Sequence, residues 1–205
     1  MSPQRIQQLL YYNSEKWMKE YAAKNLAPKT IFRYKELLDT RITPALGHLK
    51  IANIKPMHFL EFYNNLLEDG IRKDGKPGGL SPLTIKHHHR LIHAIFESAV
   101  QWQLLAINPV DHVTPPKVKK TEAGFLEIDD IDMLLTALAP LNKSDLKYKA
   151  GTFITLASGM RLGELMGLFW SSIDFDKNTI QITQANQYLP AQGIFTKEPK
   201  NYSSK

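Results

Sequence analysis

The chain contains no cysteine, which excludes disulfide bonds, thiolate metal sites and cysteine nucleophiles. It also lacks long apolar runs, since a stretch such as residues 153–157 is far shorter than the roughly 20 residues that cross a bilayer. The N-terminal sequence MSPQRIQQLL has no apolar core of a secretory signal. These absences predict a cytoplasmic protein. The 43% hydrophobic and 22% charged residues are typical of an ordinary globular fold.

Charge is distributed unevenly along the 205 residues. Residues 1–121 contain 18 Lys and Arg against 10 Asp and Glu, a net charge of +8, whereas residues 122–205 contain 8 against 10, a net charge of −2. A basic surplus of this size fits a surface that contacts phosphates, although many basic domains bind no nucleic acid. Both readings stay open on charge alone.

Prolines and lysines separate the two parts. Pro109, Pro115 and Pro116 cannot continue a helix, and three lysines follow closely: Lys117, Lys119 and Lys120. We therefore expect a helical domain over residues 1–109, an extended basic linker over 110–122 and a second domain over 123–205. The linker is either a solvated connector or a segment that lies along an acidic polymer.

The first part carries apolar residues at helical spacing. Four helices are predicted to open at Ser14, Pro28, Pro56 and Ser81-Pro82, because small polar residues cap helices and proline suits the first turn. The last helix has an apolar stripe that predicts its buried face: Ile85, His88, Ile92, Ile95, Ala99 and Trp102.

Basic and polar side chains lie away from that stripe. The candidate nucleic-acid contacts are Lys86, His87 and Arg90 on the last helix, with His93 beyond them, Lys29, Thr30 and Arg33 on the second helix, and the linker lysines. Donors near a helix N-terminus suit phosphate contacts, because the helix dipole also favours an anion there. For each residue an ordinary solvated surface is the alternative.

Three consecutive histidines invite a metal hypothesis. Successive residues of a helix point about 100° apart, so His87, His88 and His89 cannot converge on one ion. His89 and His93 are four residues apart, but no third ligand is near them in the sequence. We therefore predict no metal site.

The second part begins with predicted helices over residues 128–138 and from Asp145 to Ser158. A Ser-Gly turn follows, and Arg161 then opens another apolar helix beside free backbone N–H groups, which is a suitable arrangement for holding a phosphate. Glu164, three residues later, is placed to orient a neighbour. A plain surface pair of Arg161 and Glu164 is the alternative.

The segment LASGMRLGELMGLFWSSIDFD resembles the first catalytic box of the tyrosine recombinases, the phage-integrase family. LAPKTIFRYKELL, ALGHLKIANIKP and LSPLTIKHHHRLIHAIFESAVQWQLLAINPV resemble blocks of that family's core-binding domain, in the same order. The resemblance implies a mainly α, SAM-like DNA-binding domain of four to five helices. It also implies that the start of an α+β catalytic domain with a small antiparallel sheet follows.

The resemblance also implies site residues. Arg161 would stabilise the scissile phosphate, and Glu164 would hold the site in order. NTIQIT alternates as a strand does, with Ile180 and Ile182 on one face. The later PKNYSSK resembles the family's lysine hairpin, which assigns the catalytic lysine to Lys200, with Lys197 as the weaker candidate.

The implied function is site-specific DNA recombination through a phosphotyrosyl intermediate, with double-stranded DNA and further recombinase protomers as partners and no cofactor. A bacterial or phage-encoded protein acting on the nucleoid is expected. The family's His-x-x-Arg box and nucleophilic tyrosine do not follow Arg161 within the sequence, so residues 1–205 alone are predicted to be an inactive fragment. A non-catalytic DNA-binding module, or a remnant that occupies recombination sites, is the alternative.

Overall fold

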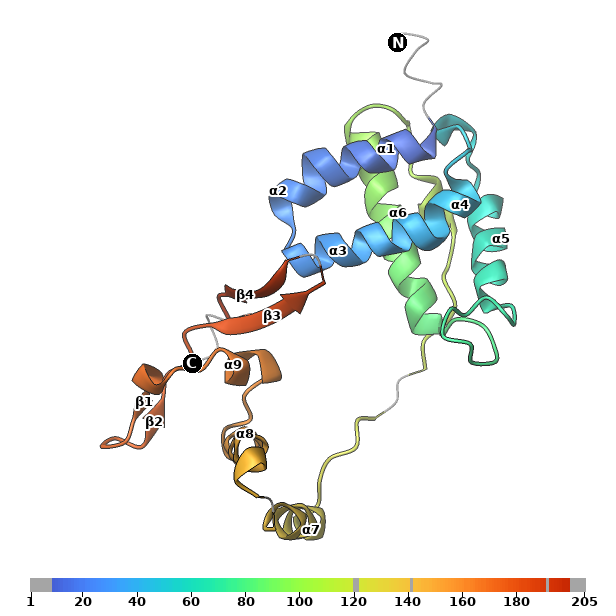
Figure 1. Cartoon of the computed structure of the whole chain (residues 1–205). Helices are drawn as coiled ribbons and strands as arrows, with labels where there is room; N and C mark the ends of the chain where they lie inside the picture. Colours follow the sequence, from blue (N-terminus) through green and yellow to red (C-terminus); the bar gives the residue numbers. More distant parts are fainter. Residues whose placement is uncertain (1–8, 120–121, 141, 191, 200–205) are drawn as a thin grey trace. The chain divides into compact units, whose positions relative to one another are not determined.

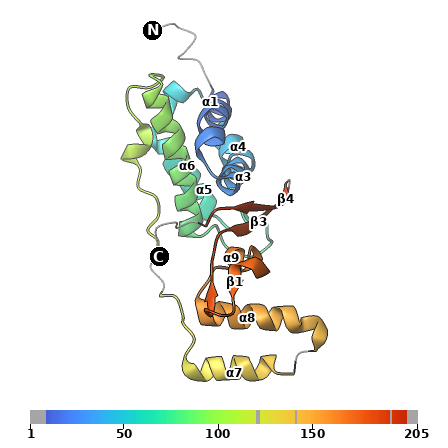
Figure 2. The same cartoon turned by 90° about the vertical axis from the view of Figure 1, so that its left-hand side faces the viewer.

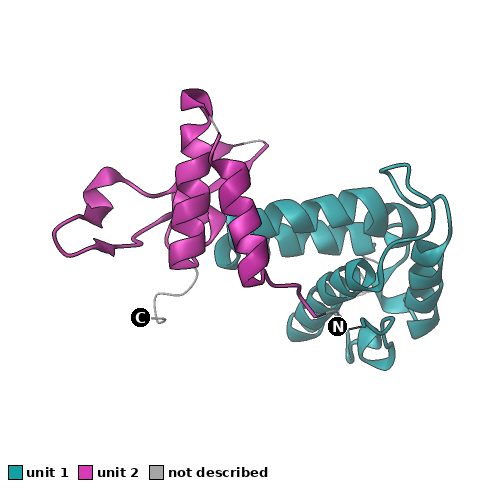
Figure 3. Cartoon of the chain, turned by 90° about the horizontal axis from the view of Figure 1, so that it is seen from below, with its two compact units in different colours: residues 1–121 teal, residues 122–205 magenta. Residues whose placement is uncertain are grey.

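The protein is described by a computed structural model that covers residues 9–119, 122–140, 142–190 and 192–199. The chain folds into two compact units, residues 1–121 (unit 1) and 122–205 (unit 2), coloured separately in Figure 3. Unit 1 is built from helices, and unit 2 combines helices with short antiparallel strands. This composition confirms the predicted fold class.

The α-helices of unit 1 are α1 (Leu10–Trp17), α2 (Ala23–Asn25), α3 (Pro28–Leu37), α4 (Thr43–Leu46), α5 (Pro56–Leu67) and α6 (Pro82–Gln101). Three of the predicted starts are confirmed, because Pro28 and Pro56 begin their helices and the Ser81 hydroxyl caps α6 by accepting from the Thr84 N–H. The prediction for Ser14 was wrong. Its helix begins at Leu10, and the buried Ser14 hydroxyl instead donates to the Leu10 carbonyl at 2.9 Å.

Two of these helices contain a π-helical turn. The segment Met18–Ala22 joins α1 to α2, and Leu38–Ile42 joins α3 to α4 without a break in the helical backbone. A π turn has i→i+5 hydrogen bonds and therefore holds more residues than an α turn. Each of these helices is thus continuous but changes its register once.

Helix α6 runs through the middle of unit 1 (Figure 1). The predicted stripe is its buried face from Ile85 to Ala99, and Trp102 packs against the core while partly exposed. Phe96 of α6 meets Phe59 of α5 edge to face, with ring centroids 5.3 Å apart. Such aromatic pairs stabilise a core beyond the area that they bury.

The core of unit 1 extends further along the chain than residue 109. A 3-10 helix over Pro109–His112 follows α6, and Val110 and Val113 are buried in the same apolar cluster. The segment expected to be a linker from residue 110 therefore begins as part of the helical unit. From Thr114 to Lys119 the chain has no regular secondary structure.

Unit 2 contains α7 (Ile128–Leu138), α8 (Leu146–Ser158) and α9 (Leu162–Met166), with α7 and α8 side by side (Figure 2). Its strands form two antiparallel pairs, β1 (Ile173–Asp174) with β2 (Thr179–Ile180) and β3 (Ala185–Leu189) with β4 (Gly193–Lys197). The strand predicted to continue through Ile182 ends at Ile180. Short 3-10 helices over Ile51–Asn53, Lys143–Asp145 and Trp170–Ser172 complete the described elements.

The longest helix of the described segments, α6, has 20 residues. Neither it nor any other described helix has the length and apolar character needed to cross a membrane.

Candidate active site and nucleic-acid interface

Arg161 lies at the junction of two helices. Helix α8 ends at Ser158, and Gly159 caps it with a left-handed φ of 66°, which suits glycine at a helix C-terminus. The next residue, Met160, is buried, and Arg161 adopts an extended conformation as the N-cap of α9. The backbone of Arg161 is therefore held between the buried Met160 and the first turn of α9.

Glu164 holds Arg161 from the first turn of α9. One carboxylate oxygen accepts from the Arg161 backbone N–H at 2.9 Å, and the other accepts from the Arg161 Nη1 at 3.0 Å. The Arg161 side chain is 60% exposed, whereas that of Glu164 is only 8% exposed. The backbone N–H of Arg161 and then its guanidinium lower the pKa of Glu164. An ionised carboxylate therefore orients the guanidinium, most of which faces solvent.

Helix α9 packs tightly against β3. A Cβ at Gly163 would lie 3.0 Å from the Asn186 carbonyl oxygen, and one at Gly167 would lie 3.1–3.2 Å from backbone atoms of residues 184–186. Two side chains complete the junction, because Gln184 Nε2 donates to the Gly167 carbonyl at 2.8 Å and Asn186 Nδ2 donates to the Met166 carbonyl at 2.7 Å. Both bonds satisfy carbonyls that the end of a helix leaves without partners.

The sequence reasoning did not single out Gln184 or Asn186. The sequence offered one indication of this junction: Gly163 and Gly167 are four residues apart, so they lie on the same face of α9, where another backbone can approach closely. Because of these contacts, the helix that begins beside Arg161 and the β3–β4 hairpin form one packed assembly.

The candidate lysines lie at the end of that hairpin. Lys197 is the last residue of β4, is partly buried, and pairs with Ala185 of β3, the strand that packs on α9. The preferred candidate, Lys200, lies outside the described residues. Its assignment stays a prediction.

The nucleic-acid candidates on α3 and α6 are largely accessible. Lys29, Arg33, His87 and Arg90 are exposed, and Thr30 and Lys86 are partly exposed. Arg33 is paired with Glu36 at 2.5 Å, so only part of its guanidinium is available to another anion. Past the core of unit 1, Lys117 and Lys119 are exposed, whereas Lys120 lies outside the described residues.

The four histidines of α6 have different surroundings. His87 is exposed, and His88 is buried, with its Nδ1 2.9 Å from the Thr84 carbonyl. His89 Nδ1 lies 3.0 Å from the Tyr63 hydroxyl. His93, grouped in the sequence with the outward donors, is 2.9 Å from the Asp111 carboxylate. His87 is thus the histidine that remains most open to a ligand.

Both units match families of known proteins. The family model described as "Phage integrase, N-terminal SAM-like domain" matches residues 10–67, and the model "Phage integrase family" matches residues 124–197. The chain is 28% identical over 173 residues to an integrase of Saccharopolyspora erythraea, covering 83% of this chain and 36% of that protein. It is also 28% identical over 173 residues to a XerC-like tyrosine recombinase of Caldanaerobacter subterraneus, covering 81% and 41%.

Solved structures give the same fold. The Tn1549 transposon integrase, in complex with transposon right end DNA, matches 94% of this chain and 58% of its own with a TM-score of 0.72 and 22% identity. A lambda integrase dimer bound to a COC' core site matches 95% of this chain and 50% of its own with a TM-score of 0.66. The chain belongs to the tyrosine recombinase, or phage integrase, family. It spans less than half the length of the two curated relatives described above.

Proposed function

We propose that this chain is part of a site-specific DNA recombinase that cuts and rejoins duplex DNA through a phosphotyrosyl intermediate. The observation that carries the proposal is the Arg161–Glu164 pair, in which a buried carboxylate holds an exposed guanidinium at the start of α9. A guanidinium held in this way presents fixed N–H donors to a phosphate. The match to the phage integrase family over residues 124–197 contains this pair.

The proposed roles follow from the charges of the reaction. When a tyrosine attacks the phosphodiester, negative charge grows on the non-bridging oxygens, and Arg161 stabilises it with donors that are already oriented. The leaving hydroxyl needs a proton, which Lys200 supplies. Glu164 does not react; it keeps Arg161 in place. No metal or nucleotide is needed, because the phosphotyrosyl bond conserves the energy of the broken bond.

The proposed partner is double-stranded DNA, bound by α3, α6 and the basic segment that follows unit 1, together with further recombinase protomers on the same DNA. The net charge of +8 on residues 1–121 supports DNA binding. The solved Tn1549 and lambda integrases that share the fold are complexes with DNA, and the lambda integrase is recorded as a dimer and as a tetramer.

The proposal is tested in a recombinase that contains residues 1–205 together with the family's His-x-x-Arg box and nucleophilic tyrosine. A suicide substrate, nicked beside the scissile phosphate, should trap a covalent protein–DNA adduct. Arg161→Lys should reduce adduct formation about a hundredfold or more, because an ammonium cannot replace the two parallel hydrogen bonds that a planar guanidinium donates to a phosphate. Absence of an adduct, at DNA concentrations that saturate binding, would favour the second candidate: a module that occupies sites without cutting them.

A second substrate distinguishes the proposed role of Lys200 from that of Arg161. Lys200→Ala should also slow cleavage, but a substrate whose bridging oxygen is replaced by sulfur has a leaving group that hardly needs a proton. That substrate should rescue Lys200→Ala and leave Arg161→Lys defective. Rescue of Lys197→Ala in its place would move the proton donor to Lys197.

A further inference from the structure

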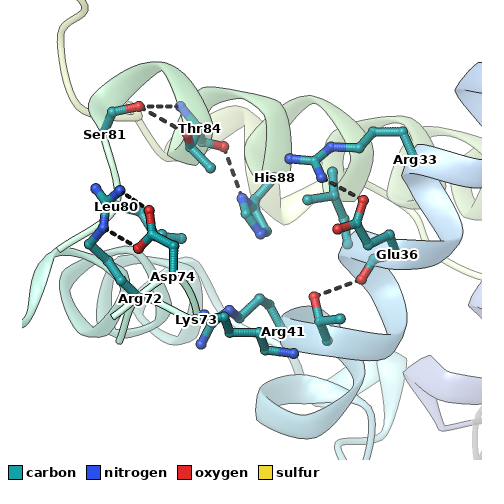
Figure 4. A pocket seen from close by; sticks show the side chains of 12 residues that line it. Arg33, Glu36, Arg41, Arg72, Lys73, Asp74, Leu80, Ser81, Thr84 and His88 are labelled. Atoms are coloured by element: carbon teal, nitrogen blue, oxygen red, sulfur yellow. Dashed lines mark hydrogen bonds and ion pairs between the residues drawn. The ribbon is translucent and has the colours of Figure 1, made fainter. Parts of the chain in front are cut away.

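Unit 1 contains a polar pocket of about 460 Å³ between α3, the loop over residues 71–80 and the first turns of α6 (Figure 4). Its lining combines basic, acidic and hydroxyl side chains; those that bear on its chemistry are Arg33, Arg41, Arg72, Lys73, Ser81 and His88. The pocket therefore joins two helices that carry candidate DNA contacts.

His88 projects from α6 into this pocket, as Figure 4 shows. Its side chain is 1% exposed, and because its Nδ1 lies 2.9 Å from the Thr84 carbonyl, that nitrogen carries the proton and donates it. The Nε2 of a neutral ring is then an acceptor, and it has no hydrogen-bond partner among the described residues. A buried polar atom without a partner costs free energy. A ligand that satisfies Nε2 would recover that cost.

The charges of the pocket favour an anion. Four cations line it against two acids, Glu36 and Asp74. Glu36 pairs with Arg33, and Asp74 pairs with Arg72, which leaves Arg41 and Lys73 without a carboxylate partner in the described chain. One nitrogen of Arg41 donates to the Ile71 carbonyl, so the guanidinium is anchored at one edge. The N-terminus of α6, capped by Ser81, adds a further partial positive charge.

We propose that this pocket binds a phosphate group, and that His88 takes up a proton on binding and donates its Nε2–H to a phosphate oxygen. A phosphate oxygen accepts hydrogen bonds and donates none when ionised, so neutral Nε2 cannot bind it and protonated Nε2 can. Arg41 and Lys73 would contact the other oxygens. If the phosphate is part of a DNA backbone, this inference rests on the proposed function. The pocket would then be one contact within the proposed DNA interface of α3 and α6.

The charged groups around the His88 imidazole explain why phosphate binding would be coupled to proton uptake. Arg33 and Glu36 face it from α3, and Arg41 faces it from the π turn that follows α3. Arg72, Lys73 and Asp74 face it from the loop, Phe62 from α5, and His87 precedes it on α6. Burial, and then the cations Arg33 and Arg41, lower the pKa of His88 in the unbound protein. A bound phosphate offsets those cations and stabilises the imidazolium. Phosphate affinity is therefore expected to fall as the pH rises.

The test uses the 205-residue chain and a short duplex of arbitrary sequence, with the dissociation constant measured between pH 5.5 and 7.5. The phosphodiester does not titrate in this range, so a pH dependence reports on the protein. One linked proton weakens binding by up to about tenfold per pH unit. His88→Leu should remove that component, and the matched variant His48→Leu, exposed in unit 1 and outside both the pocket and the candidate DNA contacts, should keep it.

Histidine ring signals in the NMR spectrum of the wild-type chain provide a readout that needs no variant. Duplex DNA should raise the pKa of the His88 ring. If millimolar inorganic phosphate alone does the same, the pocket accepts a free phosphate; if only the duplex does, it accepts a backbone phosphate. The inference is overturned if neither probe moves the His88 signals, or if a folded His88→Leu variant keeps the full pH dependence.

These results separate the inference from the proposed function. Strong, salt-dependent DNA binding with unchanged His88 signals would overturn the pocket assignment and leave the recombinase proposal intact. A response of His88 to inorganic phosphate without DNA binding would support the pocket and count against the proposed DNA interface.

Discussion

Unit 1 and unit 2 differ in how completely they bury their large apolar side chains. In unit 1 the large side chains of α1, α5 and α6 are buried in one cluster, with Trp17, Phe59 and Phe96 at most 1% exposed. In unit 2, Phe125, Ile128 and Trp170 are each more than 75% exposed, and the described helices α7 and α8 have no buried residue. Among the described residues, hydrophobic burial therefore contributes more to the stability of unit 1 than to that of unit 2.

Truncation of an aromatic side chain in each unit should give the largest contrast. Phe96→Ala in unit 1 should lower the free energy of unfolding by about 3–5 kcal/mol, because it leaves a cavity beside Phe59. Trp170→Ala, at a side chain that is 79% exposed, should change it by less than about 0.5 kcal/mol. Denaturant titration followed by circular dichroism measures both. Equal losses in the two variants would remove the distinction between the units.

A methyl group at Gly167 should disturb unit 2 where α9 packs against β3. The added Cβ would meet backbone atoms of β3 at 3.1–3.2 Å, and overpacking of this kind costs about 1–3 kcal/mol. Gly167→Ala should therefore accelerate amide hydrogen exchange in β3 and leave α6 unchanged. Gly124→Ala is the matched control, because a Cβ there meets nothing within 4 Å. Unchanged exchange in β3 would contradict the tight junction.

Mild acid should affect unit 1 through His88. Burial lowers its pKa in the folded state below the ordinary value of 6.5, so the unfolded chain binds the proton more readily. The stability contribution of the neutral ring is present above about pH 6.5 and is lost as the pH falls below it. Thermal unfolding without phosphate, measured from pH 7.5 to 5.5, should show a decrease in the wild type that His88→Leu reduces. An identical decrease in both would contradict the assignment.

Stronger acid should affect unit 2 through Glu164, with the smallest expected change. Hydrogen bonds from Arg161 lower the pKa of this carboxyl, so its stabilising contribution is present above about pH 4.5 and is lost as the pH falls through the folded-state value. Glu164→Gln should flatten that dependence. Hydrogen exchange of α9 amides between pH 5 and 3, corrected for intrinsic rates, tests it, and an unchanged profile in Glu164→Gln would show that Glu164 is not the titrating group.

The sequence predicted most of unit 1 because its signals are local. Proline at the first helical position and Ser81 as a cap depend on neighbouring residues only, and the α6 stripe follows from helical periodicity. The start of α1 was missed because Ser14 fits a cap by type, yet it lies inside a helix and donates to the Leu10 carbonyl. Val110 and Val113 were assigned to a linker because prolines flank them, and their burial depends on a long-range fit that no local pattern contains.

The candidate site was predictable to a similar extent. Arg161 and Glu164 were identified by their motif, and their spacing of three residues already implied mutual contact at a helix start. The roles of Gln184 and Asn186 depend on where β3 lies against α9, which single-residue propensities do not report. The pocket around His88 was missed because its walls come from three separate segments, and the helical stripe correctly placed this histidine among core residues without showing its unpaired nitrogen.

The π turn over Leu38–Ile42 has a consequence for how the sequence tolerates insertion and deletion. It takes up an additional residue within a continuous helix, so deletion of the exposed Asp39 should convert it to a regular α-helical turn with little loss of helix. Everything after the deletion would keep its orientation relative to α3, because the π turn confines the additional residue to one turn. Ile42 and Leu46 would stay in the core, and Arg41 would still face the Ile71 carbonyl. In alignments with relatives, a one-residue gap is therefore expected to fall within this turn.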